Sequence, residues 1–188
     1  RADLKIGKFS SGLQVIGHNI HPQEPSVNGL FAIDRVTQPH QHTIESSVYT
    51  DYTLQTGSLS TTAGLRTIFY KYGDYQRVSF DPVVSMTYQL NAASQLILRS
   101  SLKHQYLHRS GFSDMGLPTE FWFSACQQFP AQYAWNISLG FETWSKNRMY
   151  HLTLETYYKR IYHQQEYSGN VFDVIYSSYD LQSMLLHG

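Results

Sequence analysis

Residues 134–162 contain two runs in which apolar and polar side chains alternate strictly, separated by a short polar break. In the first run Trp135, Ile137, Leu139 and Phe141 share one parity, and the second run repeats the pattern up to Tyr162. A period of two predicts strands with two unlike faces, and the polar break at residues 145–148 predicts the turn of a β-hairpin. Each run covers about ten residues, the length that a tilted strand needs to cross a bilayer.

The same alternation recurs earlier in the chain and predicts strands over residues 44–54, 61–70, 79–90 and 96–105. Pro82 lies inside the third of these and requires a bulge, an edge position or a later start. The breaks at residues 55–58, 91–94 and 145–148 are short, whereas long connections cover residues 22–42, 111–130 and 169–188. Only the short link at 73–77 departs from this regular order, which is typical of an outer-membrane β-barrel.

The N-terminal region gives a weaker pattern. Residues 1–11 form a polar stretch with a possible turn at Ser11-Gly12, and a first strand over residues 13–20 follows. Pro22 and Pro25 end its pairing, and residues 29–34 are a candidate for a short extra strand.

Composition limits the fold classes that remain. A length of 188 residues suits one domain. The 15 tyrosines fit a partly solvent-exposed sheet surface better than a fully buried hydrophobic core. The net charge is zero, so nothing indicates nucleic acid as a partner, and the single Cys126 excludes an internal disulfide. No apolar run of about eighteen residues exists, which excludes a helical membrane protein but not a β-barrel.

The charged side chains of the predicted strands fall almost entirely on the polar parity. An arginine or lysine on a lipid face costs about 2 to 4 kcal/mol at mid-bilayer, so a membrane wall requires this segregation, although a soluble sheet with one wet face segregates charge equally well. Aromatic residues near the strand ends favour the barrel, because such residues form interfacial girdles. The charges concerned are Glu45, Asp51, Arg66, Arg99, Lys103, Glu142, Glu155 and Lys159.

Residues 44–188 resemble the C-terminal part of the barrel of TonB-dependent outer-membrane receptors, particularly those of Bacteroidetes-like bacteria. Val83 departs from the family pattern, in which arginine often follows the proline. The resemblance depends on the order and spacing of VYTDY at 48–52, AGLR at 63–66, DPVVS at 81–85, YLH at 106–108 leading into GLPT at 116–119, and ETYYKR at 155–160.

The resemblance implies an all-β fold: an antiparallel up-and-down meander that forms about seven strands of a larger transmembrane β-barrel, with long loops at one end. Family members have about 22 strands around an N-terminal plug, so residues 1–188 are interpreted as a fragment without the plug, the remaining strands or a signal peptide. The implied location is the bacterial outer membrane, with lipid as a partner. An open fragment is also expected to associate through its sheet edges.

The function implied by the resemblance is TonB-driven uptake of a nutrient ligand, with TonB bound through the absent N-terminal part. No catalytic motif or cofactor site is predicted. The candidate ligand-contacting residues lie at 111–130, where stacking faces adjoin carboxylates that suit sugars or cationic ligands. An alternative is that these rings pack the loop onto its neighbours. The candidates are Phe112, Asp114, Glu120, Phe121, Trp122 and Phe123.

A second class of function remains open from the residues alone. A soluble, tyrosine-rich β-sandwich that recognises carbohydrate through Trp122 and its neighbours would show the same strand pattern. The requirement for detergent separates the two classes, since only the barrel turns an apolar face outward. Histidines at positions 18, 21, 40 and 42 are possible ligands for a divalent metal, but nothing in the sequence fixes their geometry.

Overall fold

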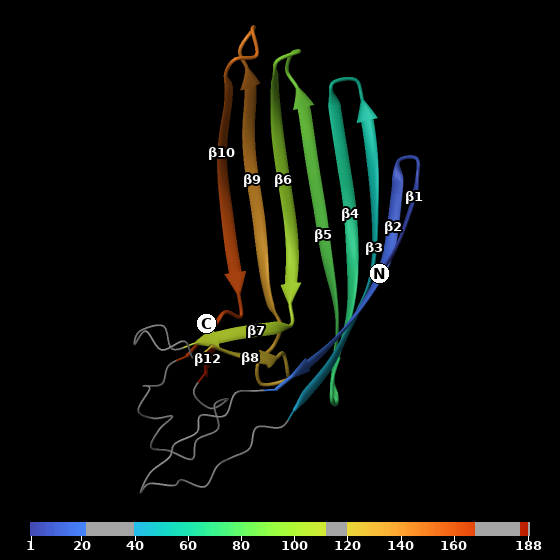
Figure 1. Cartoon of the computed structure of the whole chain (residues 1–188), viewed down its shortest axis with the longest axis vertical. Helices are drawn as coiled ribbons and strands as arrows, with labels where there is room; N and C mark the ends of the chain where they lie inside the picture. The colour runs from blue at the N-terminus through green and yellow to red at the C-terminus, as the bar shows by residue number, and fades with distance from the viewer. Residues whose placement is uncertain (22–39, 112–119, 168–184, 188) are drawn as a thin grey trace, which may run out of the picture.

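The computed structural model describes residues 1–21, 40–111, 120–167 and 185–187. Its main element is an open antiparallel sheet of eight strands in the order β1-β2-β3-β4-β5-β6-β9-β10 (Figure 1). These strands are β1 (Ala2–Ile6), β2 (Phe9–Ile20), β3 (Gln41–Thr56), β4 (Leu59–Tyr72), β5 (Tyr75–Gln89), β6 (Ser94–Gln105), β9 (Gln132–Trp144) and β10 (His151–Tyr162).

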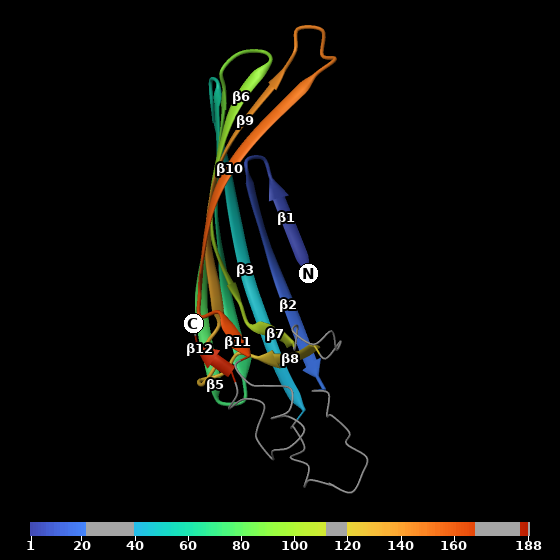
Figure 2. The same cartoon turned by 90° about the vertical axis from the view of Figure 1, so that its left-hand side faces the viewer.

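Two small antiparallel sheets complete the described structure. β7 (Leu107–Gly111) pairs with β8 (Glu120–Ser124), and β11 (Gln165–Tyr167) pairs with β12 (Leu185–His187). Figure 2 shows that the eight-stranded sheet is twisted and curved, with β7 and β8 lying across its lower part. The described residues contain no helix that is long and apolar enough to span a membrane.

The central prediction of an all-β antiparallel meander is confirmed. β9 and β10 pair along their whole length, from His151 opposite Trp144 to Tyr162 opposite Tyr133, so the alternating runs do form one hairpin. The polar break forms its turn, where Arg148 has a φ of 54°. Because pairing joins residues of like parity, the two faces continue from strand to strand.

The order of turn lengths also agrees with the prediction. In Figure 1 the short β1–β2, β3–β4, β5–β6 and β9–β10 turns lie at the top, an end that we call the turn end. At the opposite end, which we call the loop end, β2 and β6 end and β3 and β9 begin. Within the described residues, the tight β4–β5 turn at Gly73 is the exception at the loop end, as the sequence indicated.

The prediction for the N-terminal region is wrong in two respects. The turn lies at Gly7, whose φ is 57°, and residues 2–6 form an eighth strand of the sheet that the sequence pattern missed. Gly12 lies inside β2 opposite Tyr49, and a Cβ at this position would collide with the tyrosine hydroxyl. This glycine therefore allows an aromatic side chain to lie over the strand, which the sequence cannot distinguish from a turn.

Pro82 lies inside β5 without interrupting its pairing to β4, where it stands opposite Leu65. The pairing of β5 with β6 covers only Val83 to Gln89, so the missing N–H of Pro82 lies beyond the end of that ladder. The predicted loop at residues 111–130 differs from expectation, because its described part contains β8 and pairs it with β7. The candidate strand at residues 29–34 lies outside the described residues.

Candidate functional site

One face of the eight-stranded sheet is apolar and exposed. Leu65, Leu139 and Leu154 are 40%, 50% and 58% exposed, although they lie in the middle of their strands. A sheet in a soluble two-layer fold would bury such positions. The apolar face is formed by the strand positions that share the parity of these leucines, including Leu13, Val15, Val48, Tyr52, Phe69, Phe80, Met86, Leu98, Trp135 and Tyr158.

Two lysine or arginine residues of the described strands lie on the apolar face, namely Lys71 and Arg160, and both are near the loop end. The Arg160 guanidinium carbon lies 4.8 Å from the centre of the Tyr162 ring. A long cationic side chain beside an aromatic ring is typical of a boundary between apolar and polar surroundings. The middle of the face therefore carries no lysine or arginine in the described part of the sheet.

The opposite, polar face carries the charged side chains that the sequence assigned to the polar parity, which confirms the predicted segregation. The Arg66 Nη2 atom donates to Glu45 Oε1 at 3.0 Å, and the Glu45 side chain is 16% exposed. The Arg99 and Glu155 side chains approach to 3.9 Å across the intervening strand β9. The remaining members are Asp51, Lys103, Glu142 and Lys159.

At the loop end the β7–β8 hairpin packs against the polar face. The Ser124 N–H donates to Gln41 Oε1 at 2.8 Å, and the Tyr70 hydroxyl donates to the Ala125 carbonyl at 3.1 Å. Gln41 and Tyr70 belong to the polar face of β3 and β4, and both side chains are buried. These contacts fix Ser124 and Ala125 onto the polar face of the curved sheet.

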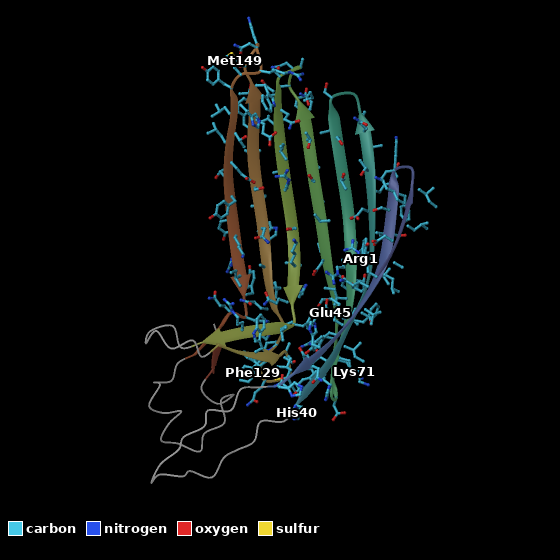
Figure 3. The ribbon with its side chains drawn as sticks, viewed as in Figure 1. Arg1, His40, Glu45, Lys71, Phe129 and Met149 are labelled. Atoms are coloured by element: carbon cyan, nitrogen blue, oxygen red, sulfur yellow. The ribbon has the colours of Figure 1, made fainter. Side chains whose placement is uncertain are left out.

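Aromatic stacking reinforces this contact. The rings of Tyr70 and Tyr106 stack at 4.3 Å, and the Tyr106 hydroxyl lies 2.5 Å from Ser79 Oγ on β5. Ile68 and Ala125 complete the buried cluster. Figure 3 places Phe129 and Lys71 at the loop end, opposite the Met149 turn. This cluster of four buried residues is small, and it lies between the eight-stranded sheet and the segment around β7 and β8.

His108 occupies the interior of the same packed segment. Its side chain is 3% exposed and stacks on Phe123 at 5.1 Å, and its Nε2 atom has no hydrogen-bond partner. Burial lowers the pKa of His108 to about 4, with a hydrogen bond to the backbone of Pro130 opposing part of the decrease. The imidazole is therefore neutral at pH 7.

The structure separates the six predicted ligand-contacting residues. Trp122 is 43% exposed, with the Arg109 guanidinium carbon 5.9 Å from its ring centre. Phe123 is buried between His108 and Phe129, so its ring packs the segment together. Glu120 and Phe121 belong to β8 and pair with Gly111 and Ser110. Phe112 and Asp114 lie outside the described residues.

A polar cavity at the turn end was not expected from the sequence. Gln95 Nε2 donates to Glu142 Oε2 at 2.8 Å in its wall, and the Trp144 ring stacks on His151 at 4.0 Å. Its residues come from two hairpins that the linear sequence does not bring together. The cavity has a volume of about 500 Å³ and is lined by Gln89, Ala92, Ala93, Gln95, Glu142, Trp144, Ser145, Lys146 and Arg148.

The histidines show limited clustering. The rings of His21 and His40 meet edge to face at 4.3 Å. Within the described ranges, no group of three or more His, Cys, Asp or Glu side chains is arranged to hold a metal ion.

Comparison with known proteins finds no family model, no curated protein and no solved structure that matches the chain. Assignment of a function therefore depends on the physical character of the two sheet faces and of the segment that packs on one of them.

Proposed function

We propose that the chain forms part of the wall of an outer-membrane β-barrel, in a receptor that takes up a nutrient ligand by a TonB-driven mechanism. In this proposal the apolar face contacts lipid and the polar face lines the barrel interior. The turn end lies on the periplasmic side, and the loop end lies outside the cell, as in other outer-membrane barrels.

The single observation that carries the proposal is the inverted polarity of the sheet. Leu139 and Leu154 are about half exposed, whereas the polar-face residues Ser47 and Thr43 are 1% and 3% exposed. In water this arrangement would lose the hydrophobic stabilisation that drives folding, because the apolar side chains would remain exposed to solvent. In a bilayer the same arrangement is favourable, since the apolar side chains contact hydrocarbon.

A soluble β-sandwich requires a second layer over the apolar face. In the described structure the β7–β8 sheet does not supply one, because Gln41 and Tyr70 hold it against the polar face. The carbohydrate-binding alternative thus receives no support from the packing.

The ligand would be contacted from the loop end. Of the predicted residues whose side chains are described, Trp122 alone is exposed. Its indole ring offers a stacking surface beside the Arg109 guanidinium, an arrangement suited to a sugar or another polar ligand. The TonB-driven step and the identity of the receptor class depend on the resemblance of residues 44–188 to such receptors.

A pair of neighbouring reporter residues tests the assignment of the two faces. Leu139 belongs to the apolar face and Ser138 to the polar face of β9. In a background with Trp122, Trp135 and Trp144 changed to phenylalanine, Leu139→Trp and Ser138→Trp each provide one fluorophore. The variants are reconstituted into phospholipid vesicles with or without bromine on the acyl chains.

We expect brominated chains to quench Leu139→Trp strongly and Ser138→Trp weakly, because only the first reporter touches hydrocarbon. The two positions are adjacent in sequence, so they share the same depth and differ only in the face that they report. Equal quenching of both reporters, or a protein that remains a clean monomer in plain buffer, would contradict the membrane assignment.

A further inference from the structure

The cavity at the turn end is walled by two neighbouring hairpins, β5–β6 and β9–β10 (Figure 1). Gln89, Gln95 and Glu142 stand opposite one another on β5, β6 and β9, so they form one row across the polar face. The backbone N–H of Trp144 donates to the Ala93 carbonyl at 2.9 Å and joins the two hairpins. All the lining residues belong to these hairpins, so the walls of the cavity are the same whatever adjoins β1 or β10.

The Trp144 ring is held in place with one face open. Its other face stacks on the His151 ring, with 4.0 Å between the ring centres and 13° between the planes. His151 lies on β10, whereas the β5–β6 hairpin lies on the opposite side of β9. The indole lines the cavity and is 46% exposed, so the face directed away from His151 is accessible to a ligand. A fixed aromatic face of this kind is a stacking surface for a sugar ring.

Hydrogen-bonding groups are fixed beside this ring. The Gln95 Nε2 atom donates to Glu142 Oε2 at 2.8 Å, and the Gln89 Nε2 atom donates to the Asn91 carbonyl at 2.7 Å. The Oε1 atoms of the two glutamines and of Glu142 have no hydrogen-bond donor within the described structure. Oriented acceptors next to a stacking surface suit the hydroxyl groups of a sugar.

The charges of the cavity favour a ligand that carries a negative charge. The lining contains one carboxylate, Glu142, and two cations, Lys146 and Arg148. Neither cation lies within ion-pair distance of a carboxylate in the described part of the chain. Ammonium and guanidinium groups bind carboxylates through charge-assisted hydrogen bonds, so both cations are available to a carboxylate on the ligand.

We propose that the turn-end cavity binds an acidic saccharide, a sugar whose ring carries a carboxylate. The sugar ring lies on the open face of Trp144, and its hydroxyl groups donate to the free oxygens of Gln95 and Glu142. The ligand carboxylate accepts hydrogen bonds from Lys146 and Arg148. The volume of about 500 Å³ lies within the range of about 300 to 1,000 Å³ that small-molecule sites occupy.

This site would name the class of ligand that the proposed receptor takes up. With the turn end on the periplasmic side, the cavity lies where a ligand leaves the barrel interior, and this placement rests on the proposed function. The cavity itself rests only on the two hairpins and does not require lipid at the apolar face.

Other classes of ligand would use only part of the cavity. A neutral sugar stacks on Trp144 but leaves both cations unpaired. A cationic ligand pairs with Glu142 but is repelled by Lys146 and Arg148. A small anion without a ring pairs with the cations and leaves the indole uncovered. An acidic saccharide alone among these matches the ring, the acceptors and the excess of positive charge.

Tryptophan fluorescence tests the site locally. In the variant Trp122→Phe/Trp135→Phe, Trp144 is the one fluorophore that remains. The full chain is kept in a polyoxyethylene detergent, which has no sugar headgroup to compete for the cavity. The probes are the methyl glycosides of glucuronic acid and galacturonic acid, each matched by the methyl glycoside of the neutral sugar, glucose or galactose.

We expect at least one of the two acids to change the Trp144 emission saturably. That acid should bind about tenfold more tightly than its neutral counterpart, because only the acid pairs with the two cations. The preference should decrease as salt is added, since the cations are exposed and their charges are screened.

Removal of the cations should remove the preference. In Lys146→Gln/Arg148→Gln the affinity for the acid is expected to decrease about tenfold, to that of the neutral glycoside, which itself should bind as before. Both side chains are exposed in the turn, so the changes leave the packing of the sheet intact. Lys103→Gln is the matched control, because it removes an exposed cation of the same face outside the cavity and should change neither affinity.

A Trp144 emission that neither acid changes would overturn the proposal. Equal binding of each acid and its neutral counterpart would also overturn it, as would a preference for the acid that survives the loss of both cations. The lipid reporters at residues 138 and 139 measure a different property and stay informative in each case. Saccharide binding in a protein whose reporters show no lipid contact would support the cavity as a saccharide site and reject the membrane wall.

Discussion

Lowering the pH should release the β7–β8 segment from the polar face. His108 is the group responsible, because its imidazole is buried against Phe123 and its Nε2 atom has no hydrogen-bond partner. A proton added to this side chain would introduce a charge into an apolar environment, where no salt bridge to His108 is present among the described residues. The contacts that hold the segment would then have to open, beginning with Ser124 to Gln41 and Tyr70 to Ala125.

The size and sign of the effect follow from the pKa of His108. Burial lowers this pKa from 6.5 to about 4, so the open segment binds a proton more readily than the packed one. The packed form is therefore fully favoured above pH 6.5, loses stability as the pH falls from 6.5 to about 4, and loses no more from this group below that value. At about 1.4 kcal/mol for each pKa unit, the total is about 3 kcal/mol.

Amide hydrogen exchange followed by mass spectrometry measures the release locally. After correction for intrinsic exchange rates, we expect peptides that cover residues 120–130 to lose protection between pH 6.5 and pH 4, while peptides from the middle of β9 change less. The variant His108→Phe keeps the stack on Phe123 and cannot titrate, so its protection should stay level over this range. An equal loss in His108→Phe, or no loss in the natural chain, would refute the reasoning.

Three further perturbations test other parts of the structure. Leu65→Arg should destabilise the vesicle-reconstituted protein by about 2 to 4 kcal/mol in urea unfolding, whereas Leu65→Phe should be near neutral. If Leu65→Arg were as well tolerated as Leu65→Phe, the face that carries Leu65 would contact water and not lipid. Asp81→Ala should cost about 1 to 3 kcal/mol in the same assay because it removes the acceptor of the His104 backbone and ring N–H groups, with Asp81→Asn intermediate. Gly57→Ala should lower the free energy of unfolding by about 1 kcal/mol, because Gly57 has a φ of 55°, which alanine adopts with strain. Gly17→Ala is the control and should cause no such loss, because Gly17 lies in extended backbone and a Cβ there would meet no atom within 4 Å. Similar losses at both positions would exclude backbone strain as the cause.

The strands could be predicted well wherever one face differs from the other. In β9 and β10 the alternation is uninterrupted, so the sequence specified both the pairing and the turn at residues 145–148. In β1 only Leu4 and Ile6 mark the apolar parity, and five residues give too little alternation to detect. Gly12 added an error of a different kind, because its role depends on Tyr49, which lies far away in the sequence.

The packed segment at the loop end could not be predicted for a related reason. Its residues have no period, and the contact of Ser124 with Gln41 joins positions 83 residues apart. Phe123 and Trp122 look equivalent in the sequence, yet one ring is buried and the other is exposed. The aromatic residues at 121–123 predicted contacts with either a ligand or the protein. Only the fold shows that the Phe123 ring packs on His108 and Phe129 within the protein.

A local defect in the sheet links these observations. The ladder between β5 and β6 ends at Val83, and beyond it the Asp81 carboxylate accepts hydrogen bonds from the backbone and ring nitrogens of His104. A side chain thus replaces the backbone partner that Pro82 and the diverging strand would otherwise leave missing. The chain is then free to turn after Gln105, which brings the Tyr106 ring onto Tyr70 and carries the β7–β8 segment onto the polar face. The segment therefore crosses the polar face at the loop end because the ladder stops there, and the apolar face on the other side stays uncovered.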